Sequence, residues 1–228
     1  MKQHQDGPAD TRMMGIVHDA LRRDLRRMRA ALTAELAPDG ERRRALAAHA
    51  GWLMHFLHDH HAGEDDGLYP MVRAANAEAI PLLDQMDAQH TAIGPCMESF
   101  RVAAETWGSS GADADRTALV GALDALTAVL EPHLELEENE MMPVAAASIT
   151  QRQWHEWDQR MNVRSKSLRQ LAEEGNWLLD ELDDPRRQIL YGEVPTPVRV
   201  VIVRGFGPGY RRRSALRWGT PLRSGAGA

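Results

Sequence analysis

The chain has 228 residues, 43% of them apolar and 26% charged, a composition that supports a packed core and excludes a disordered chain. Its formal net charge of −6 argues against a nucleic-acid-binding protein, because phosphate contacts require an excess of Lys and Arg. No stretch approaches the ~18 apolar residues of a membrane span, and no secretory signal is evident. The single cysteine, Cys96, cannot form an internal disulfide. We therefore expect a soluble, cytoplasmic protein with neither nucleic acid nor a membrane as partner.

Four long segments are predicted to be helices, roughly 11–36, 41–76, 80–107 and 113–142, because clusters of Gly, Pro and Asp separate them. In each, apolar side chains recur every three or four residues, which is the spacing of a helix face and not of a strand. These four seams contain Met14, His18, Leu21, Leu25, Met28 and Leu32; Leu46, Ala50, Leu53, Leu57, His60, Glu64 and Leu68; Leu83, Met86, His90, Ile93, Met97 and Phe100; Leu119, Leu123, Leu126, Leu130, His133, Glu137 and Met141. The pattern predicts an all-α fold, an antiparallel up-down four-helix bundle.

Each seam is interrupted by histidine, and two seams also contain glutamate. A carboxylate that is buried without a partner is unstable as a charged group, so it either becomes neutral or acquires a counter-charge. Two interior glutamates that face four interior histidines therefore predict a bound cation, and a metal ion supplies one.

The strongest pattern is an internal repeat, in which two blocks align without gaps: HHAGEDDGLYP from His60 and HLELEENEMMP from His133. One further seam histidine precedes each block, His18 by 42 residues and His90 by 43. The unit His…His-x3-Glu is thus present twice, which predicts two helical hairpins related by approximate symmetry. Residues four apart lie on one helix face, so the His and Glu of each block can reach the same side. Such mixed imidazole and carboxylate ligands with open positions favour iron over manganese or zinc.

The order H…HxxxE…H…HxxxE resembles the hemerythrin-like HHE cation-binding family, over residues from about 11 to 145. The resemblance implies two iron ions, bridged by carboxylates and by an oxo or hydroxo group. It implies that the iron ligands are His18, His60, Glu64, His90, His133 and Glu137. Among these, Glu64 and Glu137 would be the bridging carboxylates.

The chain departs from oxygen-carrying hemerythrins at two positions. The carriers have a second histidine four residues after the third-helix ligand, where this chain has Gly94. They also have an aspartate five residues after the last histidine, whereas here Glu137 follows His133 by four. A ligand set with less histidine would leave the iron more open, which makes reversible oxygen transport a weaker expectation than reactive or sensory chemistry.

We therefore expect a non-haem di-iron protein that reacts with or senses dioxygen, hydrogen peroxide or nitric oxide. A di-iron oxidase activity or a catalase-like disproportionation of peroxide stays open, and no catalytic residue is assigned beyond the metal centre. The alternatives are a non-catalytic iron-binding or iron-responsive module that acts through a partner, a reversible oxygen binder, and a metal-free helical interaction protein. A redox partner, or a homo-oligomer formed through the C-terminal part, also stays open.

Four residues beside the repeat have two interpretations each. His61 is either a seventh ligand or distal proton donor, or a group outside the site. Asp65 and Glu138 occupy equivalent positions in the two blocks; they either accept hydrogen bonds from ligand imidazoles or, more simply, lie on a solvated helix face. Tyr69 could reach the site, although a buried packing role is the simpler expectation.

The other histidines near the first block are expected to lie outside the site. By spacing, His55 and His58 face away from the seam, and His49 lies further from the repeat. The methionines of the seams are explained by packing, since Met is a flexible side chain that fills irregular gaps.

Residues 146–228 are predicted to form a C-terminal helical extension with a basic, partly flexible tail. Residues 150–182 are predicted to be one amphipathic helix. For the segment VRVVIV, at 198–203, a short helix is favoured over a strand because no other strand is predicted. After Val194 the chain has seven Arg and no acidic residue, and we expect this tail to be solvated.

Overall fold

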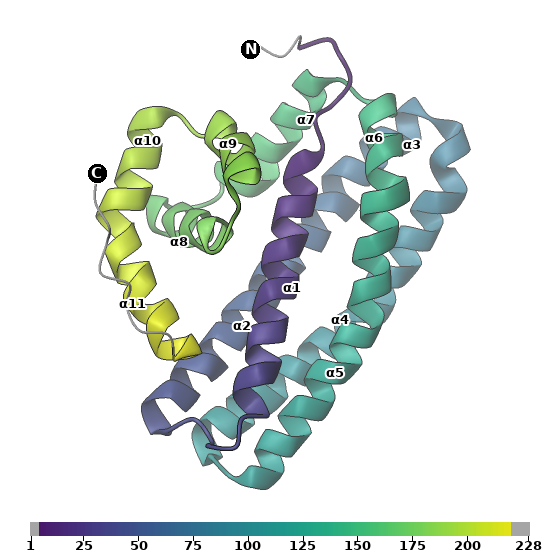
Figure 1. Ribbon diagram of the computed structural model, residues 1–228. Helices are drawn as coiled ribbons and strands as arrows, with labels where there is room; N and C mark the ends of the chain where they lie inside the picture. The colour runs from purple at the N-terminus through teal and green to yellow at the C-terminus, as the bar shows by residue number, and fades with distance from the viewer. Residues whose placement is uncertain (1–4, 220–228) are drawn as a thin grey trace.

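The computed structural model describes residues 5–219, which form helices and contain no β-strand. The long helices are α1 (Arg12–Leu32), α2 (Gly40–Gly63), α4 (Ile80–Ser110) and α5 (Asp113–Leu136). These four helices lie side by side, and the C-terminal helices α8 (Leu168–Leu179) to α11 (Gly207–Trp218) pack against one side of them (Figure 1). The predicted all-α class is confirmed.

The first helix is shorter than predicted, since it ends at Leu32 and not near residue 36. Its buried face nevertheless contains the whole predicted seam, from Met14 to Leu32. The next residue with the same spacing, Leu36, is 86% exposed, so no core contact favours a further turn. Instead the backbone N–H and the hydroxyl of Thr33 both donate to the Arg29 carbonyl, which closes the last turn.

Two helices are interrupted by a π-helical turn at the same point of the sequence repeat. After α2 the turn η1 (Glu64–Leu68) leads into α3 (Tyr69–Ala75), and after α5 the turn η3 (Glu137–Met141) leads into α6 (Met142–Ser148). Proline occupies the second position of α3 and of α6, where its missing N–H cannot continue an α-helical ladder. The sequence predicted uninterrupted α-helices here, the last of them ending near residue 142, where α6 begins.

Capping residues account for several helix ends. The side chain of Asp39 accepts the Arg42 N–H at the start of α2. That of Asn76 accepts the Glu78 N–H at the start of the short η2 (Ala77–Ala79), which precedes α4. Gly111 ends α4 in the left-handed conformation, at φ 67°, which glycine adopts without steric cost.

The C-terminal part is divided into several short helices, so the single helix predicted over 150–182 is wrong. The helical segment ends at Val163, and Ser167 caps a new helix by accepting a hydrogen bond from the Gln170 N–H. The segment VRVVIV is helical, as favoured from the sequence. The elements are α7 (Gln151–Asp158), η4 (Gln159–Val163), α8 (Leu168–Leu179), α9 (Asp184–Glu193), α10 (Thr196–Val200), η5 (Val201–Phe206) and α11 (Gly207–Trp218).

Much of the arginine-rich region, expected to be a solvated tail, is the packed helix α11. Tyr210 and Arg217 are buried on it, while Arg211 and Arg212 are exposed. The last part of the predicted flexible tail, 220–228, lies outside the described residues.

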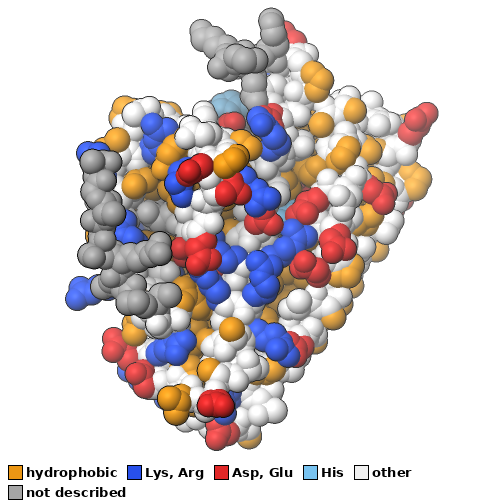
Figure 2. All heavy atoms as spheres, in the orientation of Figure 1, with side chains coloured by type: hydrophobic (Ala, Val, Ile, Leu, Met, Phe, Trp, Pro, Cys, Tyr) orange, Lys and Arg blue, Asp and Glu red, His pale blue; other side chains and the backbone are white. Residues whose placement is uncertain are grey.

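One apolar core runs through the long helices and into the C-terminal helices. Trp177 of α8 and Tyr210 of α11 belong to the same cluster of buried side chains as Leu21, Leu53 and Phe100. Acidic and basic side chains are mixed over the face on which α1 meets the C-terminal helices (Figure 2). Among residues 5–219, no helix combines the length and the apolar character that crossing a membrane would require.

Candidate metal centre

All six residues that the sequence singled out converge inside the layer of long helices. His18 comes from α1, His60 from α2, His90 from α4 and His133 from α5, while Glu64 and Glu137 are the first residues of η1 and η3. Both glutamates are fully buried, as are His18 and His133. The seams bring these groups together because each lies on the face that the neighbouring helices cover.

A first group of potential metal ligands contains His18, His60 and Glu137. Nε2 of His18 lies 3.3 Å from Nε2 of His60 and 3.3 Å from Oε2 of Glu137. One ligand atom from each residue lies within 4.8 Å of the others, which is close enough for one ion to bind all three.

A second group contains His61, His90 and His133. Nε2 of His90 lies 3.2 Å from Nε2 of His133, and the ring of His61 stacks on that of His90 at a centroid distance of 4.1 Å. His61 is 6% exposed, and its Nε2 is buried without a hydrogen-bond partner. Of the interpretations open for His61, this position supports that of a ligand.

The two glutamates lie between these groups. Oε1 of Glu64 is 3.2 Å from Nε2 of His60, and its Oε2 is 3.6 Å from Nε2 of His90. Oε2 of Glu137 is 3.3 Å from Nε2 of His18 and 3.9 Å from Nε2 of His133. Each carboxylate therefore reaches one imidazole of each group, which is the placement a bridging ligand needs.

Carboxylates outside the centre orient two of the imidazoles. Nδ1 of His18 lies 2.8 Å from Oε1 of Glu138, which also accepts a hydrogen bond from Arg22 at 2.6 Å. Nδ1 of His90 lies 2.7 Å from Oδ1 of Asp65. An Nδ1–H that donates to a carboxylate leaves the Nε2 lone pair free to point inward, as metal binding requires. The two acids thus contact imidazoles of the candidate centre and do not lie on a purely solvated face.

Neutral groups complete this outer layer. Nδ1 of His133 lies 3.1 Å from the amide oxygen of Gln89. Tyr69, which is 1% exposed, donates its hydroxyl to Oε1 of Glu137 at 3.4 Å. Tyr69 therefore has both the packing role expected from the sequence and a direct contact with the site.

Several carboxylate oxygens of the centre have no hydrogen-bond donor within the described residues. Both carboxylate oxygens of Glu64 and Oε2 of Glu137 are buried without a hydrogen-bond donor. Burial, together with repulsion from Glu137, raises the pKa of Glu64 well above its usual value. Burial and repulsion from His18 lower the pKa of His60 to about 3, so this imidazole is neutral at physiological pH. Imidazole nitrogens and buried carboxylate oxygens without donors form a set that fits a metal cation.

A comparison with protein-family models identifies residues 10–145 with the hemerythrin HHE cation binding domain. The chain belongs to this family. No curated protein and no solved structure gave a significant match. Membership in the hemerythrin family indicates that the domain binds metal cations, typically iron, and the two His/Glu groups are where a cation could be held.

The candidate centre of this hemerythrin domain contains a fifth imidazole, that of His61, although the position at which the carriers have a further histidine is a glycine. Gly94, the position at which carriers have a histidine, is exposed, and a Cβ added there would contact nothing within 4 Å. His61 instead lies beside His90 and His133. The sequence predicted a site poorer in histidine, but the geometry supplies a third imidazole to the second group from α2.

A cavity of about 140 Å³ adjoins the hemerythrin centre on the side of His60. Phe56 of α2 and Trp154 and Trp157 of α7 form part of its wall, and Lys166 lies above the Phe56 ring at 5.7 Å. Cavities of roughly 150 Å³ hold a benzene-sized molecule, so this one exceeds the needs of a diatomic ligand. The C-terminal helices therefore build one approach to the centre.

The remaining predictions around the hemerythrin centre concern histidines outside it. His55 and His58 are exposed, as expected, and His55 lies 3.5 Å from Asp59. His49 is 4% exposed and contacts Asp24, away from the six predicted ligands. Sequence reasoning missed this buried pair, and it also missed Gln89, since one polar side chain on a helix carries no distinguishing pattern.

Proposed function

We propose that this protein is a non-haem di-iron protein that reacts with or senses dioxygen, hydrogen peroxide or nitric oxide. In this proposal α1, α2, α4 and α5 form the antiparallel up-down four-helix bundle of a hemerythrin. The observation that carries it is the pair of fully buried glutamates between two groups of imidazole nitrogens, in which both oxygens of Glu64 and Oε2 of Glu137 lack a donor. Bound cations would supply the positive charge that such buried carboxylates require.

One iron would be bound by His18 and His60, and the other by His61, His90 and His133. Glu64 and Glu137 would contact both ions, and we infer that His61 is the seventh ligand. These five imidazoles and two carboxylates leave room for a small external ligand.

When bound, the iron pair would supply Lewis acidity and one-electron redox changes to the small molecule. The protein's own groups hold the ligands in place: Glu138, fixed by Arg22, orients His18, and Asp65 orients His90. The Tyr69 hydroxyl carries a proton beside Oε1 of Glu137, at the edge of the centre. The cavity beside His60 would give a small molecule one approach to the centre.

Reversible oxygen binding is a second candidate function, because His61 restores the number of imidazoles that a carrier has. We continue to propose a cytoplasmic location. A redox partner, or a second copy of the chain, is proposed as the macromolecular partner.

Anaerobic reconstitution with Fe(II) tests the centre. We expect about two irons per chain, and a near-ultraviolet absorption band after exposure to oxygen or peroxide. The double variant His60→Ala/His133→Ala should lose most of the iron, whereas the control His55→Ala/His58→Ala, at exposed positions, should keep it. Unchanged iron binding in the first variant would refute the site. Sustained release of oxygen from peroxide would favour an enzyme, and a reversible spectral change under oxygen would favour a carrier.

A further inference from the structure

A buried arginine on α11, Arg217, forms no ion pair within residues 5–219. Arg217 on α11 is 6% exposed, and its Nε and Nη2 atoms are buried without a hydrogen-bond partner. Its guanidinium contacts the rings of Tyr210, at 5.6 Å, and Trp218, at 5.9 Å. These aromatic contacts give partial compensation only, because arginine is rarely buried unless it is paired.

The charge of Arg217 cannot be removed within the fold. Arginine keeps its proton under all ordinary conditions, so it cannot become neutral as a buried lysine or histidine can. The compensating charge must therefore come from a carboxylate or from a bound anion.

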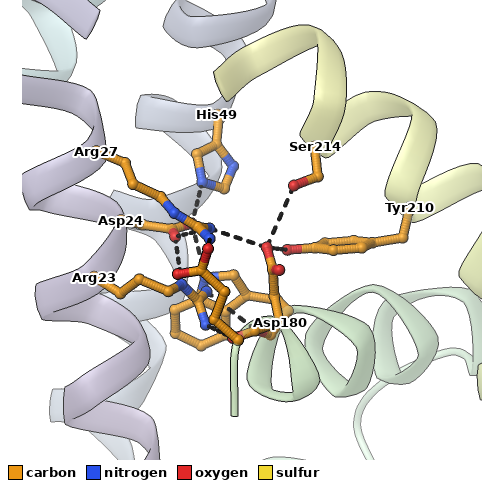
Figure 3. A network of polar contacts seen from close by, with 9 residues as sticks. Arg23, Asp24, Arg27, His49, Asp180, Tyr210 and Ser214 are labelled. Carbon is orange, nitrogen blue, oxygen red and sulfur yellow. Dashed lines mark hydrogen bonds and ion pairs between the residues drawn. The ribbon is translucent and has the colours of Figure 1, made fainter. Parts of the chain in front are cut away.

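Two carboxylates act electrostatically on Arg217, those of Asp24 and Glu173, and both already bind other donors. Figure 3 shows Asp24 among the donors that surround it, which include His49 at 2.7 Å and Arg23 at 2.9 Å. The indole N–H of Trp177 adds a further hydrogen bond to Asp24 at 2.9 Å. The second nearby carboxylate, Glu173, is paired with Arg213.

A groove of about 490 Å³ opens beside Arg217, between α2, α8 and α11. Arg169 and Arg213 also line it, so three arginines face one glutamate, Glu173. The half-buried ring of Trp52 forms part of the wall, next to His49, on which it stacks at 5.4 Å. Pockets for small organic molecules are roughly 300–1,000 Å³, so the groove has a suitable size.

We propose that this groove binds an oxyanion, a phosphate or carboxylate group, carried on a small molecule with a flat apolar body. The planar guanidinium of Arg217 has paired N–H donors that match such a group, its Nε and Nη2, which lack partners. Arg169 adds positive charge at the rim of the groove, where Arg213 is paired with Glu173. The apolar body would lie against Trp52. The site does not depend on whether the metal centre is loaded.

Thermal unfolding and tryptophan fluorescence test this site on the full chain, with and without added iron. The probes are phenyl phosphate, benzoate, inorganic phosphate and neutral benzyl alcohol, each measured at the same ionic strength set with sodium chloride. We expect phenyl phosphate or benzoate to raise the melting temperature and change the fluorescence in a saturable manner, while benzyl alcohol does neither. The anion that binds more tightly identifies the head group.

Variants separate a built site from general charge attraction. Arg217→Met should weaken phenyl phosphate binding at least about tenfold, and Arg169→Met, at the exposed rim, should weaken it severalfold. Arg212→Met, on the exposed side of α11, should bind as the parent does. Without anion, Arg217→Met should be as stable as the parent or more so, since it removes an unpaired buried charge.

Three outcomes would overturn the proposal. They are the absence of saturable binding by either anion, an equal loss in the Arg212→Met control, or a binding signal that appears only when iron is present. The last result would place the anion on the metal. If Arg217→Met fails to fold, the comparison of Arg169→Met with Arg212→Met decides.

Discussion

The indole N–H of Trp177 donates to Oδ2 of Asp24 at 2.9 Å and joins α8 to α1 across 153 residues of chain. Asp24 is fully buried, and the imidazole of His49 and the guanidinium of Arg23 also donate to it. Although burial acts to raise the pKa of Asp24, hydrogen bonds from His49 and the positive charge of Arg23 hold it well below its usual value. The ionised carboxylate therefore holds the C-terminal helices on the body of long helices.

Removal of the Asp24 carboxylate should strongly destabilise the fold. We expect Asp24→Ala to lower the free energy of unfolding by about 3–5 kcal/mol, because buried donors lose their shared acceptor. Denaturant unfolding followed by circular dichroism at pH 7 measures the change. In the control, Asp124→Ala removes an exposed acid paired with Arg29 and should have little effect. Equal losses in the two variants would show that Asp24 has no special role.

Stability should fall as the pH drops below ~6.5, the usual pKa of histidine. Burial, which outweighs the hydrogen bond to Asp24, lowers the pKa of His49 in the folded protein. The unfolded chain then binds a proton more readily than the folded one, so acid favours unfolding in this range. The stability that Asp24 provides is present above ~3.9 and is lost at still lower pH, since its folded pKa is also lowered.

The variant His49→Gln tests the histidine part of this pH dependence. Its unfolding free energy should change less between pH 7 and pH 5 than that of the parent, while His58→Gln, at an exposed position, should behave as the parent does. A variant with the full pH dependence would assign the effect to other groups.

Glycine is required at position 67 but not at position 94. A Cβ at Gly67 would lie 2.6 Å from Cδ1 of Trp157, whose indole N–H donates to the Gly63 carbonyl at 2.8 Å. We expect Gly67→Ala to cost about 1–3 kcal/mol through overpacking and to weaken iron binding, because it displaces η1, which begins at Glu64. Gly94→Ala, whose Cβ would contact no other side chain apart from its neighbour Pro95, should have a much smaller effect on stability and none on iron binding. Thermal unfolding and iron titration measure both, and a harmless Gly67→Ala would contradict this packing.

His61 should bind iron, and its neighbour His58 should not. We expect His61→Ala to weaken the binding of one of the two irons about tenfold or more, while His58→Ala, at an exposed position, changes nothing. Iron titration under anaerobic conditions gives the two affinities. A His61→Ala variant with both affinities intact would limit the role of His61 to packing.

The double variant Glu64→Gln/Glu137→Gln should have opposite effects with and without metal. In the metal-free protein it removes two buried carboxylates and should raise the melting temperature. In the parent, iron at a hundredfold excess over its dissociation constant adds about 2.7 kcal/mol, and this gain should be lost in the variant. Differential scanning calorimetry with and without a chelator measures both effects. A variant that iron stabilises as much as the parent would exclude these carboxylates as ligands.

The sequence alone predicted the helical class and brought together the six residues of the centre. The apolar seams of α1, α2, α4 and α5 indicate which face of each helix is buried. The repeated His-x3-Glu motif places equivalent side chains on the buried faces of α2 and α5. Whether those residues bind two irons stays a prediction for reconstitution to test.

Features that depend on contacts between distant segments could not be predicted. The spacing of His61 left its role open, because whether it reaches His90 depends on how α2 and α4 pack. The Asp24–Trp177 contact has no local signal, since Asp24 has the charged character of an ordinary surface residue. The division of residues 150–182 into α7, η4 and α8 likewise follows from packing and from the Ser167 cap more than from periodicity.

The match to the family ends at residue 145, but the apolar core does not end there. Trp177 is buried against the long helices. If the chain were cut at residue 145, the apolar surface that Trp177 covers would be exposed to water. A fragment that ends at residue 145 should therefore expose this apolar surface and self-associate, even though it would retain all seven proposed ligands. Any relative that lacks the C-terminal helices must cover the same surface with other side chains or with a second subunit.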